Sequence, residues 1–242
     1  MDIGIVVFPG SNCDTDTYQA IHAVLGRSAQ YVWHEERTLE GLDAVILPGG
    51  FSYGDYLRAG AIAATSPAVR ALRPYVDGGG IVLGICNGFQ VLLEAKLLPG
   101  AMLLNTCGEL RCEFVHVRTE RAGTPFTCAL TAGQILRLPI AHAEGRYHMD
   151  AGTRAEVVAH RQVVFRYCDE NGRVTPEANP NGAMDGIAGV SSSTGAVLGL
   201  MPHPERASEQ ILGSADGRLI FESLERWVAS GRQLPAQAVR TH

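Results

Sequence analysis

The 242-residue sequence contains no long hydrophobic run and no run of basic residues. No apolar stretch reaches the roughly 18 residues that a membrane-spanning helix needs, so a span is not expected. The formal net charge is −5 and the positive charges are scattered, which argues against a nucleic-acid or anionic-membrane surface. The chain passes from Met1 and Asp2 directly into a strand pattern, so no signal peptide is expected.

Paired cysteine spacing is also lacking. Cys107 and Cys112 have no second pair of ligands nearby in the sequence, so no zinc site is expected there. Scattered free thiols indicate a reducing, cytoplasmic compartment. Apart from Cys86, each thiol is predicted to be an ordinary core or surface cysteine. The six cysteines are Cys13, Cys86, Cys107, Cys112, Cys128 and Cys168.

Apolar residues make up 46% of the chain and charged residues only 19%. Continuous apolar runs such as 3–8, 44–47 and 81–85 are typical of strands that are buried on both faces. Helical patterns stand between these runs, at 15–25 and 61–76, and a further strand is expected at 30–34. Alternation of strands and helices predicts an α/β fold with a mostly parallel sheet and helices on both faces.

The second half of the chain has a different pattern. Four further strands are expected, and antiparallel additions to the sheet are plausible there. An amphipathic helix is predicted at 216–229. One domain should therefore cover residues 1–230, with residues 231–242 as a C-terminal tail. The four expected strands are 113–118, 134–140, 162–167 and 196–200.

The most informative stretch is the apolar run 81–85 followed by Cys86 and a helical pattern over 89–97. Gly84 and Gly88 flank the cysteine in a Gly-x-Cys-x-Gly sequence, which is the layout of a nucleophile elbow with cysteine in place of serine. Amides at the start of the following helix would lower the pKa of the thiol and could bind an oxyanion. We therefore predict that Cys86 is a nucleophile.

A histidine and a carboxylate follow far downstream. His203 lies between two prolines, which restrict its backbone, and Glu205 follows two residues later. A carboxylate on one ring nitrogen would set the tautomer of the histidine and stabilise its charged form. Cys86, His203 and Glu205 are therefore the predicted catalytic residues.

A glycine-rich segment at 48–55 follows the apolar run 44–47. Its bare backbone amides suit an oxyanion hole, with one donor from Gly50 or Phe51 and another from Asn87 directly after the nucleophile. A phosphate-binding loop is not expected, because no Gly-Lys-Ser/Thr follows. The histidines of segment 142–148 lack the spacing of a zinc helix. Substrate recognition or packing beside the site is predicted for this segment instead of a metal.

Together these residues resemble the class I (triad) glutamine amidotransferases. The elbow matches that family's Gly-x-Cys-x-Gly-x-Gln sequence through Gln90, and 203–205 matches its His-Pro-Glu. The resemblance extends to about residue 230. Four segments resemble the subgroup that supplies ammonia for purine biosynthesis, namely 49–60, 141–147, 179–182 and 201–206.

The resemblance implies a flavodoxin-like, three-layer α/β/α fold and hydrolysis of glutamine through a cysteine thioester. By analogy, Gln90 contacts the backbone groups of the bound glutamine. The expected partners are a large ATP-dependent synthetase and a small bridging subunit. No cofactor is expected in this chain, and ATP and magnesium belong to the synthetase.

Three alternatives remain open from the sequence. The chain could serve another synthetase as a different triad amidotransferase. It could be a non-catalytic regulatory or scaffold domain on the same fold, although the intact triad argues against this. It could also be a cysteine hydrolase or chaperone of the same fold, which would require neither Gln90 nor the Pro-His-Pro-Glu arrangement.

Overall fold

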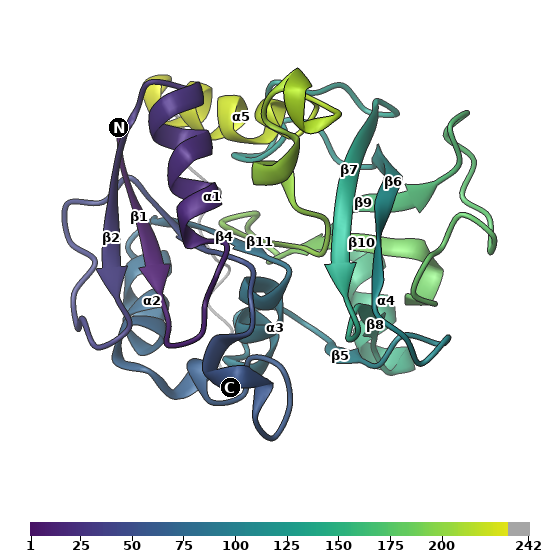
Figure 1. Ribbon diagram of the computed structural model, residues 1–242, viewed down its shortest axis with the longest axis horizontal. Helices are drawn as coiled ribbons and strands as arrows, with labels where there is room; N and C mark the ends of the chain where they lie inside the picture. The colour runs from purple at the N-terminus through teal and green to yellow at the C-terminus, as the bar shows by residue number, and fades with distance from the viewer. Residues whose placement is uncertain (232–242) are drawn as a thin grey trace.

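A computed structural model describes residues 1–231 of the chain (Figure 1). The predicted tail at 231–242 therefore lies, apart from Gly231, outside the described residues. Within these residues, five α-helices follow one another in the order α1 (Asp14–Gln19), α2 (Pro67–Asp77), α3 (Asn87–Glu94), α4 (Ala151–Ala159) and α5 (Arg218–Ala229). The strands are β1 (Asp2–Val7), β2 (Ser28–Trp33), β3 (Ala44–Leu47), β4 (Ile81–Ile85), β5 (Ala101–Leu103), β6 (Arg111–Thr119), β7 (Ile135–His142), β8 (Arg146–His148), β9 (Val163–Cys168), β10 (Ile187–Ser191) and β11 (Val197–Leu200).

Nine strands form one sheet in the order β2-β1-β3-β4-β11-β10-β9-β6-β7. The pairs from β2 to β11 are parallel, and the pairs from β11 to β7 are antiparallel. Figure 1 shows α1 and α5 on one side of the parallel strands and α2 and α3 on the other. The predicted α/β/α fold with added antiparallel strands is confirmed.

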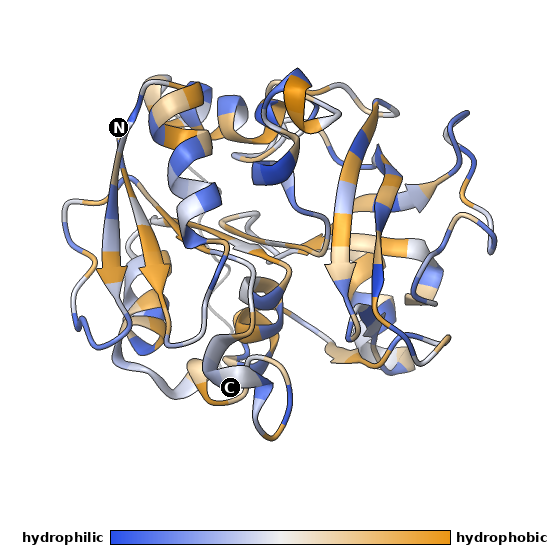
Figure 2. Ribbon diagram, viewed as in Figure 1, coloured by the Kyte–Doolittle hydropathy of each residue, from blue (hydrophilic) through white to orange (hydrophobic). Residues whose placement is uncertain are grey.

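Burial on both faces explains the composition of the central strands. Every residue of β3, β4 and β11 is buried, and Figure 2 shows these strands as largely hydrophobic along their length. The helices carry both hydrophobic and hydrophilic residues, as expected for elements with one face on the sheet. In α5, for example, Ile220, Leu224 and Trp227 are buried.

The structure differs from the sequence prediction at several elements. The strand expected at 196–200 is β11, which returns from an antiparallel hairpin with β10 to lie parallel to β4 in the middle of the sheet. The elbow helix begins at Asn87 and not at Phe89, since Cys86 of the turn is itself the N-cap residue of the helix. It ends at Glu94, just before Lys96 takes a left-handed φ of 57°.

Four elements had no sequence prediction: α4, β5, β8 and β10. Helix α4 has one buried residue, Val157, so its apolar pattern is weak. Its start is instead marked by Asp150, whose side chain accepts a hydrogen bond from the Thr153 amide. β5 and β8 have three residues each and pair only with one another in a separate sheet, so neither carries enough pattern to be recognised.

Candidate active site

Cys86 lies between β4 and α3 with φ 48° and ψ −104°. A cysteine in this part of φ/ψ space is strained by about 1–3 kcal/mol, as often occurs at functional sites. The turn is possible because its flanking residues are glycines. A Cβ on Gly88 would lie 2.0 Å from the carbonyl oxygen of Leu47, and a Cβ on Gly84 would lie 2.7 Å from that of Gly88. The elbow expected from Gly-x-Cys-x-Gly is therefore present.

The sheet topology brings His203 to this turn. β11 is parallel to β4, with Leu200 opposite Ile85, so the residues after each strand emerge at the same edge. The Cys86 amide donates a hydrogen bond to the Leu200 carbonyl at 2.8 Å. The His203 amide donates to the Pro139 carbonyl, also at 2.8 Å, which fixes the backbone that carries the imidazole.

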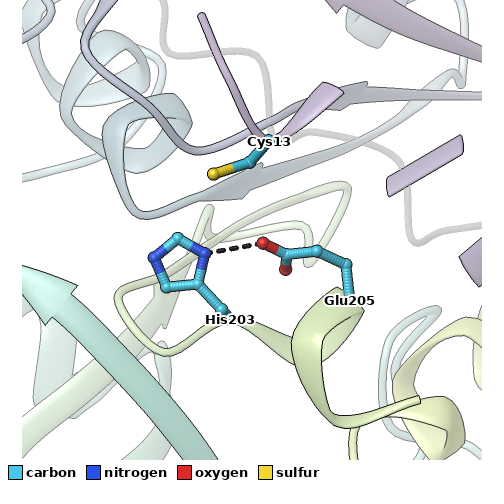
Figure 3. A group of neighbouring side chains, drawn as sticks. All are labelled: Cys13, His203 and Glu205. Atoms are coloured by element: carbon cyan, nitrogen blue, oxygen red, sulfur yellow. Dashed lines mark hydrogen bonds and ion pairs between the residues drawn. The ribbon is translucent and has the colours of Figure 1, made fainter. Parts of the chain in front are cut away.

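The imidazole of His203 is held from one side by Glu205. Nδ1 of His203 lies 2.6 Å from Oε1 of Glu205, and both residues are only 2% exposed (Figure 3). The other ring nitrogen, Nε2, is buried and makes no hydrogen bond within the described residues. It is the nitrogen left for the thiol of Cys86, with which the His203 side chain interacts. The three predicted catalytic side chains thus lie together.

Covalent catalysis by cysteine requires a thiolate next to a charged imidazole, and the electrostatics of this cluster favour both. Burial by itself raises the pKa of the Cys86 thiol, but the neighbouring His203 and His142 outweigh it and lower this pKa to about 6. Burial likewise disfavours the charged imidazole of His203, yet the Glu205 carboxylate and the Cys86 thiolate hold its pKa well above the usual value. The resting site is therefore a thiolate–imidazolium pair at neutral pH.

The reactivity of Cys86 should follow this lowered pKa. Because only the thiolate is nucleophilic, its alkylation by iodoacetamide should accelerate as the pH rises through about 6 and level off above it. The rate can be measured by mass spectrometry of the peptide that contains Cys86. The exposed thiol of Cys112 serves as an internal comparison, and a midpoint for Cys86 near 8.5, the usual value, would contradict the described electrostatics.

Cys13 also lies in the site, although the sequence predicts only an ordinary core or surface thiol at this position. It follows β1, is 2% exposed, and its Sγ lies within 4.8 Å of ligand-type atoms of both His203 and Glu205 (Figure 3). Nη2 of Arg206 donates to this Sγ at 3.2 Å. The available signal was positional, because Cys13 follows the carboxyl end of a central parallel strand, where ligand sites of such sheets form.

Cys13, His203 and Glu205 have the donor types of a zinc site. Their contacts favour a hydrogen-bonded network instead. Nδ1 of His203 already bonds to Glu205, and the Arg206 guanidinium places a positive charge against the Cys13 sulfur. The absence of a metal thus stays a prediction, and these contacts support it.

The glycine-rich loop after β3 lies beside His203 and Cys13. A Cβ on Gly49 would lie 2.6 Å from Cε1 of His203 and 3.3 Å from Sγ of Cys13, so only glycine fits there. Farther along the loop, the Ser52 amide donates to Oδ1 of Asn87 at 3.1 Å. The loop and the start of α3 are thereby joined. An oxyanion hole built from Gly50, Phe51 and Asn87 requires the loop and the start of α3 to lie together, as they do here. The oxyanion role of these three residues stays a prediction.

Gln90 lies one turn into α3 and is 5% exposed. Its Nε2 donates to the Glu144 carbonyl at 2.7 Å, and its Oε1 accepts from Nδ2 of Asn87 at 2.9 Å. The bond to Glu144 links α3 to the segment between β7 and β8, and the bond from Asn87 lies within α3. Gln90 therefore helps to hold these two parts of the site together. Its predicted contact with glutamine stays a prediction.

Asp55 approaches the same group from the loop after β3. Nδ2 of Asn87 donates to its Oδ1 at 3.1 Å. Partial burial, followed by the charge of Glu144, raises the pKa of Asp55 to about 6, while the bond from Asn87 opposes this. Asp55 was not among the sequence-predicted site residues, since nothing in the sequence places it beside α3.

Segment 142–148 follows directly on Ala141, which lies near the nucleophile, and its role in recognition or packing stays a prediction. Ala141, at the end of β7, places its carbonyl oxygen 3.9 Å from Sγ of Cys86. His142 is 3% exposed and pairs with Asn181 through Nε2. His148 is exposed and belongs to β8, so these two histidines do not converge on a common ion.

Over residues 1–231, no helix is both long and apolar enough to cross a membrane.

Known proteins match this chain along nearly its whole length. A family model described as the CobB/CobQ-like glutamine amidotransferase domain matches residues 1–228. The phosphoribosylformylglycinamidine synthase subunit PurQ of Moorella thermoacetica is 52% identical, over 98% of this chain and 100% of that protein. The subunit of the same name from Salinibacter ruber is 55% identical, over 91% and 94%.

Solved structures agree with this match. A chain in the structure of PurLQS from Thermotoga maritima superposes with a TM-score of 0.83 and 41% identity, covering 94% of this chain and 98% of that one. A putative GMP synthase subunit from Thermoplasma acidophilum superposes with a TM-score of 0.62 at 16% identity, over 95% and 94%, which shows the shared fold. The chain has a cysteine elbow with a histidine–glutamate pair beside it, and it matches the family model and these relatives along nearly its whole length. The chain therefore belongs to the CobB/CobQ-like glutamine amidotransferase family.

Proposed function

We propose that this chain is the glutaminase subunit of phosphoribosylformylglycinamidine synthase. It hydrolyses glutamine to glutamate and ammonia, and the ammonia passes to an ATP-dependent synthetase subunit in de novo purine biosynthesis. The observation that supports this most is the Cys86–His203–Glu205 cluster within a chain that matches PurQ subunits from end to end. The subunit works in the cytoplasm, consistent with its free thiols.

The geometry suits a thioester mechanism. The Cys86 thiolate attacks the side-chain amide carbon of glutamine, and a carbon–sulfur bond forms. His203 gives its Nε2 proton to the departing amide nitrogen, so ammonia leaves and the thioester remains. The neutral imidazole then takes a proton from the water that attacks the thioester. Glutamate leaves, and the thiolate–imidazolium pair is restored.

Each remaining residue has a place in this scheme. Glu205 orients His203 through Nδ1 and stabilises its charged form. Backbone amides near Gly50, Phe51 and Asn87 hold the oxyanion of the tetrahedral intermediates. Gln90 contacts the backbone groups of bound glutamine in addition to its bonds within the protein.

The chemistry that consumes ammonia lies on the partners. A large synthetase subunit, which carries ATP and magnesium, converts formylglycinamide ribonucleotide to the amidine. A small subunit bridges the two, in keeping with the PurLQS complex of Thermotoga maritima. No cofactor is assigned to this chain. The end-to-end match to PurQ subunits favours this partner over the synthetase of another triad amidotransferase.

Reconstitution tests the proposal. The purified chain should be a poor glutaminase, because ammonia released without an acceptor is wasted. Adding the large and small subunits with ATP and formylglycinamide ribonucleotide should raise glutamine turnover by about tenfold or more, which corresponds to lowering the barrier by about 1.4 kcal/mol or more. Glutamate release and amidine formation are measured in parallel. Full activity of the isolated chain would contradict the gating, and no amidine from glutamine would contradict the function.

A further inference from the structure

The loop after β3 has a backbone conformation that most of its residues disfavour. Tyr53, Asp55 and Leu57 take left-handed φ values of 54°, 53° and 68°, although none of them is glycine, and Gly54 between them has a φ of 66°. A residue with a Cβ is strained in this region, so such a conformation persists only where neighbouring groups hold it. The contacts that hold this loop therefore decide where its backbone amides lie.

One set of contacts holds the loop at Tyr53. The Tyr53 amide donates to the Pro9 carbonyl at 2.6 Å, and the Tyr53 hydroxyl lies 2.9 Å from Nδ1 of His34. Pro9 follows β1 and His34 follows β2. These contacts fix the loop to the ends of two strands, and its attachment to α3, which carries the nucleophile at its N-cap, must come from other groups.

The side-chain amide of Asn87 supplies that attachment. Its Oδ1 accepts from the Ser52 amide at 3.1 Å, and its Nδ2 donates to Oδ1 of Asp55, also at 3.1 Å. A backbone N–H can only donate and a carboxylate oxygen accepts, so both neighbours require the same orientation of the Asn87 amide. Ser52 and Asn87 are each 2% exposed. Asn87 thus joins two points of the loop to the first turn of α3.

The remaining hydrogen of Nδ2 also has a partner. Nδ2 of Asn87 donates to Oε1 of Gln90 at 2.9 Å, and Nε2 of Gln90 donates to the Glu144 carbonyl at 2.7 Å. Each atom of the Asn87 amide therefore faces a group of the complementary kind. Asp55 is the member of this set whose side chain comes from the strained loop itself, and no backbone group of the loop can replace its oxygen as an acceptor in the same place.

We propose that Asp55 is a positioning residue, which anchors the loop after β3 to α3 through the side-chain amide of Asn87. The anchor keeps the Gly50 and Phe51 amides in register with the amide of Asn87, the arrangement that an oxyanion hole needs. Asp55 does not touch the reacting atoms, and it acts on them through the loop. The anchor itself is independent of the proposed function, and only its catalytic consequence rests on that function.

The oxygen of Asp55, and not its charge, provides the anchor. Burial, followed by the charge of Glu144, raises the pKa of Asp55 to about 6, so both surroundings disfavour the carboxylate, and only the bond from Asn87 opposes them. The cation nearest in the chain, Arg58, bonds to Glu94 at the end of α3. A neutral side chain that keeps an acceptor oxygen at this position should therefore serve as well as the carboxylate.

Two substitutions separate the oxygen from the backbone. Asp55→Asn keeps an acceptor oxygen and tolerates a left-handed φ, whereas Asp55→Gly keeps only the tolerance of this φ. In the complex with the synthetase and bridging subunits, Asp55→Gly should lower kcat with glutamine by about 10- to 100-fold, the effect of losing one hydrogen bond to a charged group. The KM for glutamine should change little, because the loss falls on the transition state.

Asp55→Asn should behave like the wild type in the same assay. Asp77→Ala, at an exposed aspartate at the end of α2, is the matched control and should also leave kcat unchanged. The rate with external ammonia should be the same in all variants, since it does not use this site. Wild-type kcat in Asp55→Gly, or an equal loss in Asp55→Asn, would overturn the proposal.

A double-mutant cycle tests the route through Asn87. Asn87→Ala removes the side-chain amide and leaves the backbone amide in place. If Asp55 acts through this side chain, Asp55→Gly should have little further effect on kcat in the Asn87→Ala protein. The full effect of Asp55→Gly in both backgrounds would contradict the route, and would attribute the loss to the flexibility that glycine brings to the loop.

Hydrogen exchange in the free chain tests the anchor without any assay of activity. The Ser52 amide, which donates to Asn87, should exchange about tenfold faster or more in Asp55→Gly than in the wild type or Asp55→Asn. The alkylation midpoint of Cys86 should stay near 6 in all three, because Asp55 is not among the groups that set it. Unchanged exchange of Ser52, or a shifted midpoint, would overturn the proposal. A wild-type complex that made no amidine from glutamine would instead contradict the proposed function.

Discussion

Cys86→Ala should lower glutamine-dependent amidine formation by roughly four orders of magnitude or more, the scale seen when a covalent nucleophile is removed. The reason is that no other group of the site can form the thioester. Cys13 is close, but its sulfur accepts a hydrogen bond from Arg206, and it stands before α1 and not in the strained turn between β4 and α3. In the assembled complex, external ammonia should still support synthesis, because the synthetase subunit is untouched.

The control for this substitution is Cys112→Ala, which removes an exposed thiol. It should leave both glutamine-dependent and ammonia-dependent rates unchanged. Both rates are measured in the same preparation, together with the thermal unfolding of each variant. Glutamine turnover that survived in Cys86→Ala would contradict the role of Cys86, and loss of the ammonia-dependent rate would instead indicate that the complex had failed to assemble.

Glu205→Gln is expected to reduce kcat by about 10²- to 10⁴-fold. The carboxylate lies 2.6 Å from Nδ1 of His203 and is itself buried, so its negative charge acts at close range with little screening. An amide in its place lacks this charge and can donate to Nδ1, which favours the wrong tautomer. The imidazolium of His203 then loses its main support, and so does the Cys86 thiolate.

This substitution also has a signature that separates it from a folding defect. The pKa of Cys86 is lowered to about 6 chiefly because His203 is charged, so its alkylation midpoint should move upward in Glu205→Gln. Glu209→Gln, at an exposed position four residues later, carries the same chemical change outside the cluster and should behave as the wild type. A reduced kcat with the midpoint still near 6 would show that Glu205 does not act through the charge of His203.

Local features of the sequence were sufficient for the central prediction. The elbow depends on a strand, a cysteine and close-fitting glycines within a few residues, so Gly84, Cys86 and Gly88 could be read directly. His203 and Glu205 were found because they are near each other and flanked by prolines. The alternation of apolar runs with helical patterns likewise predicted the parallel half of the sheet.

Contacts between distant segments could not be read in this way. Cys13 and His142 look like an ordinary thiol and a loop histidine until β1, β4, β7 and β11 are brought together. Asn181 lies in a loop between β9 and β10, and only folding turns its amide toward His142. The orientation of this amide depends on a hydrogen bond from the Ala183 amide to its Oδ1, which no spacing in the sequence records.

The amino-acid order thus determined by itself where the nucleophile stands and which acid–base pair could serve it, since both are encoded by short-range geometry. Only the tertiary structure decided which nitrogen of each histidine is free and which charges surround the sulfur. Those properties arise from buried groups of separate elements, where burial removes water and leaves each hydrogen-bond partner to set the protonation of its neighbour.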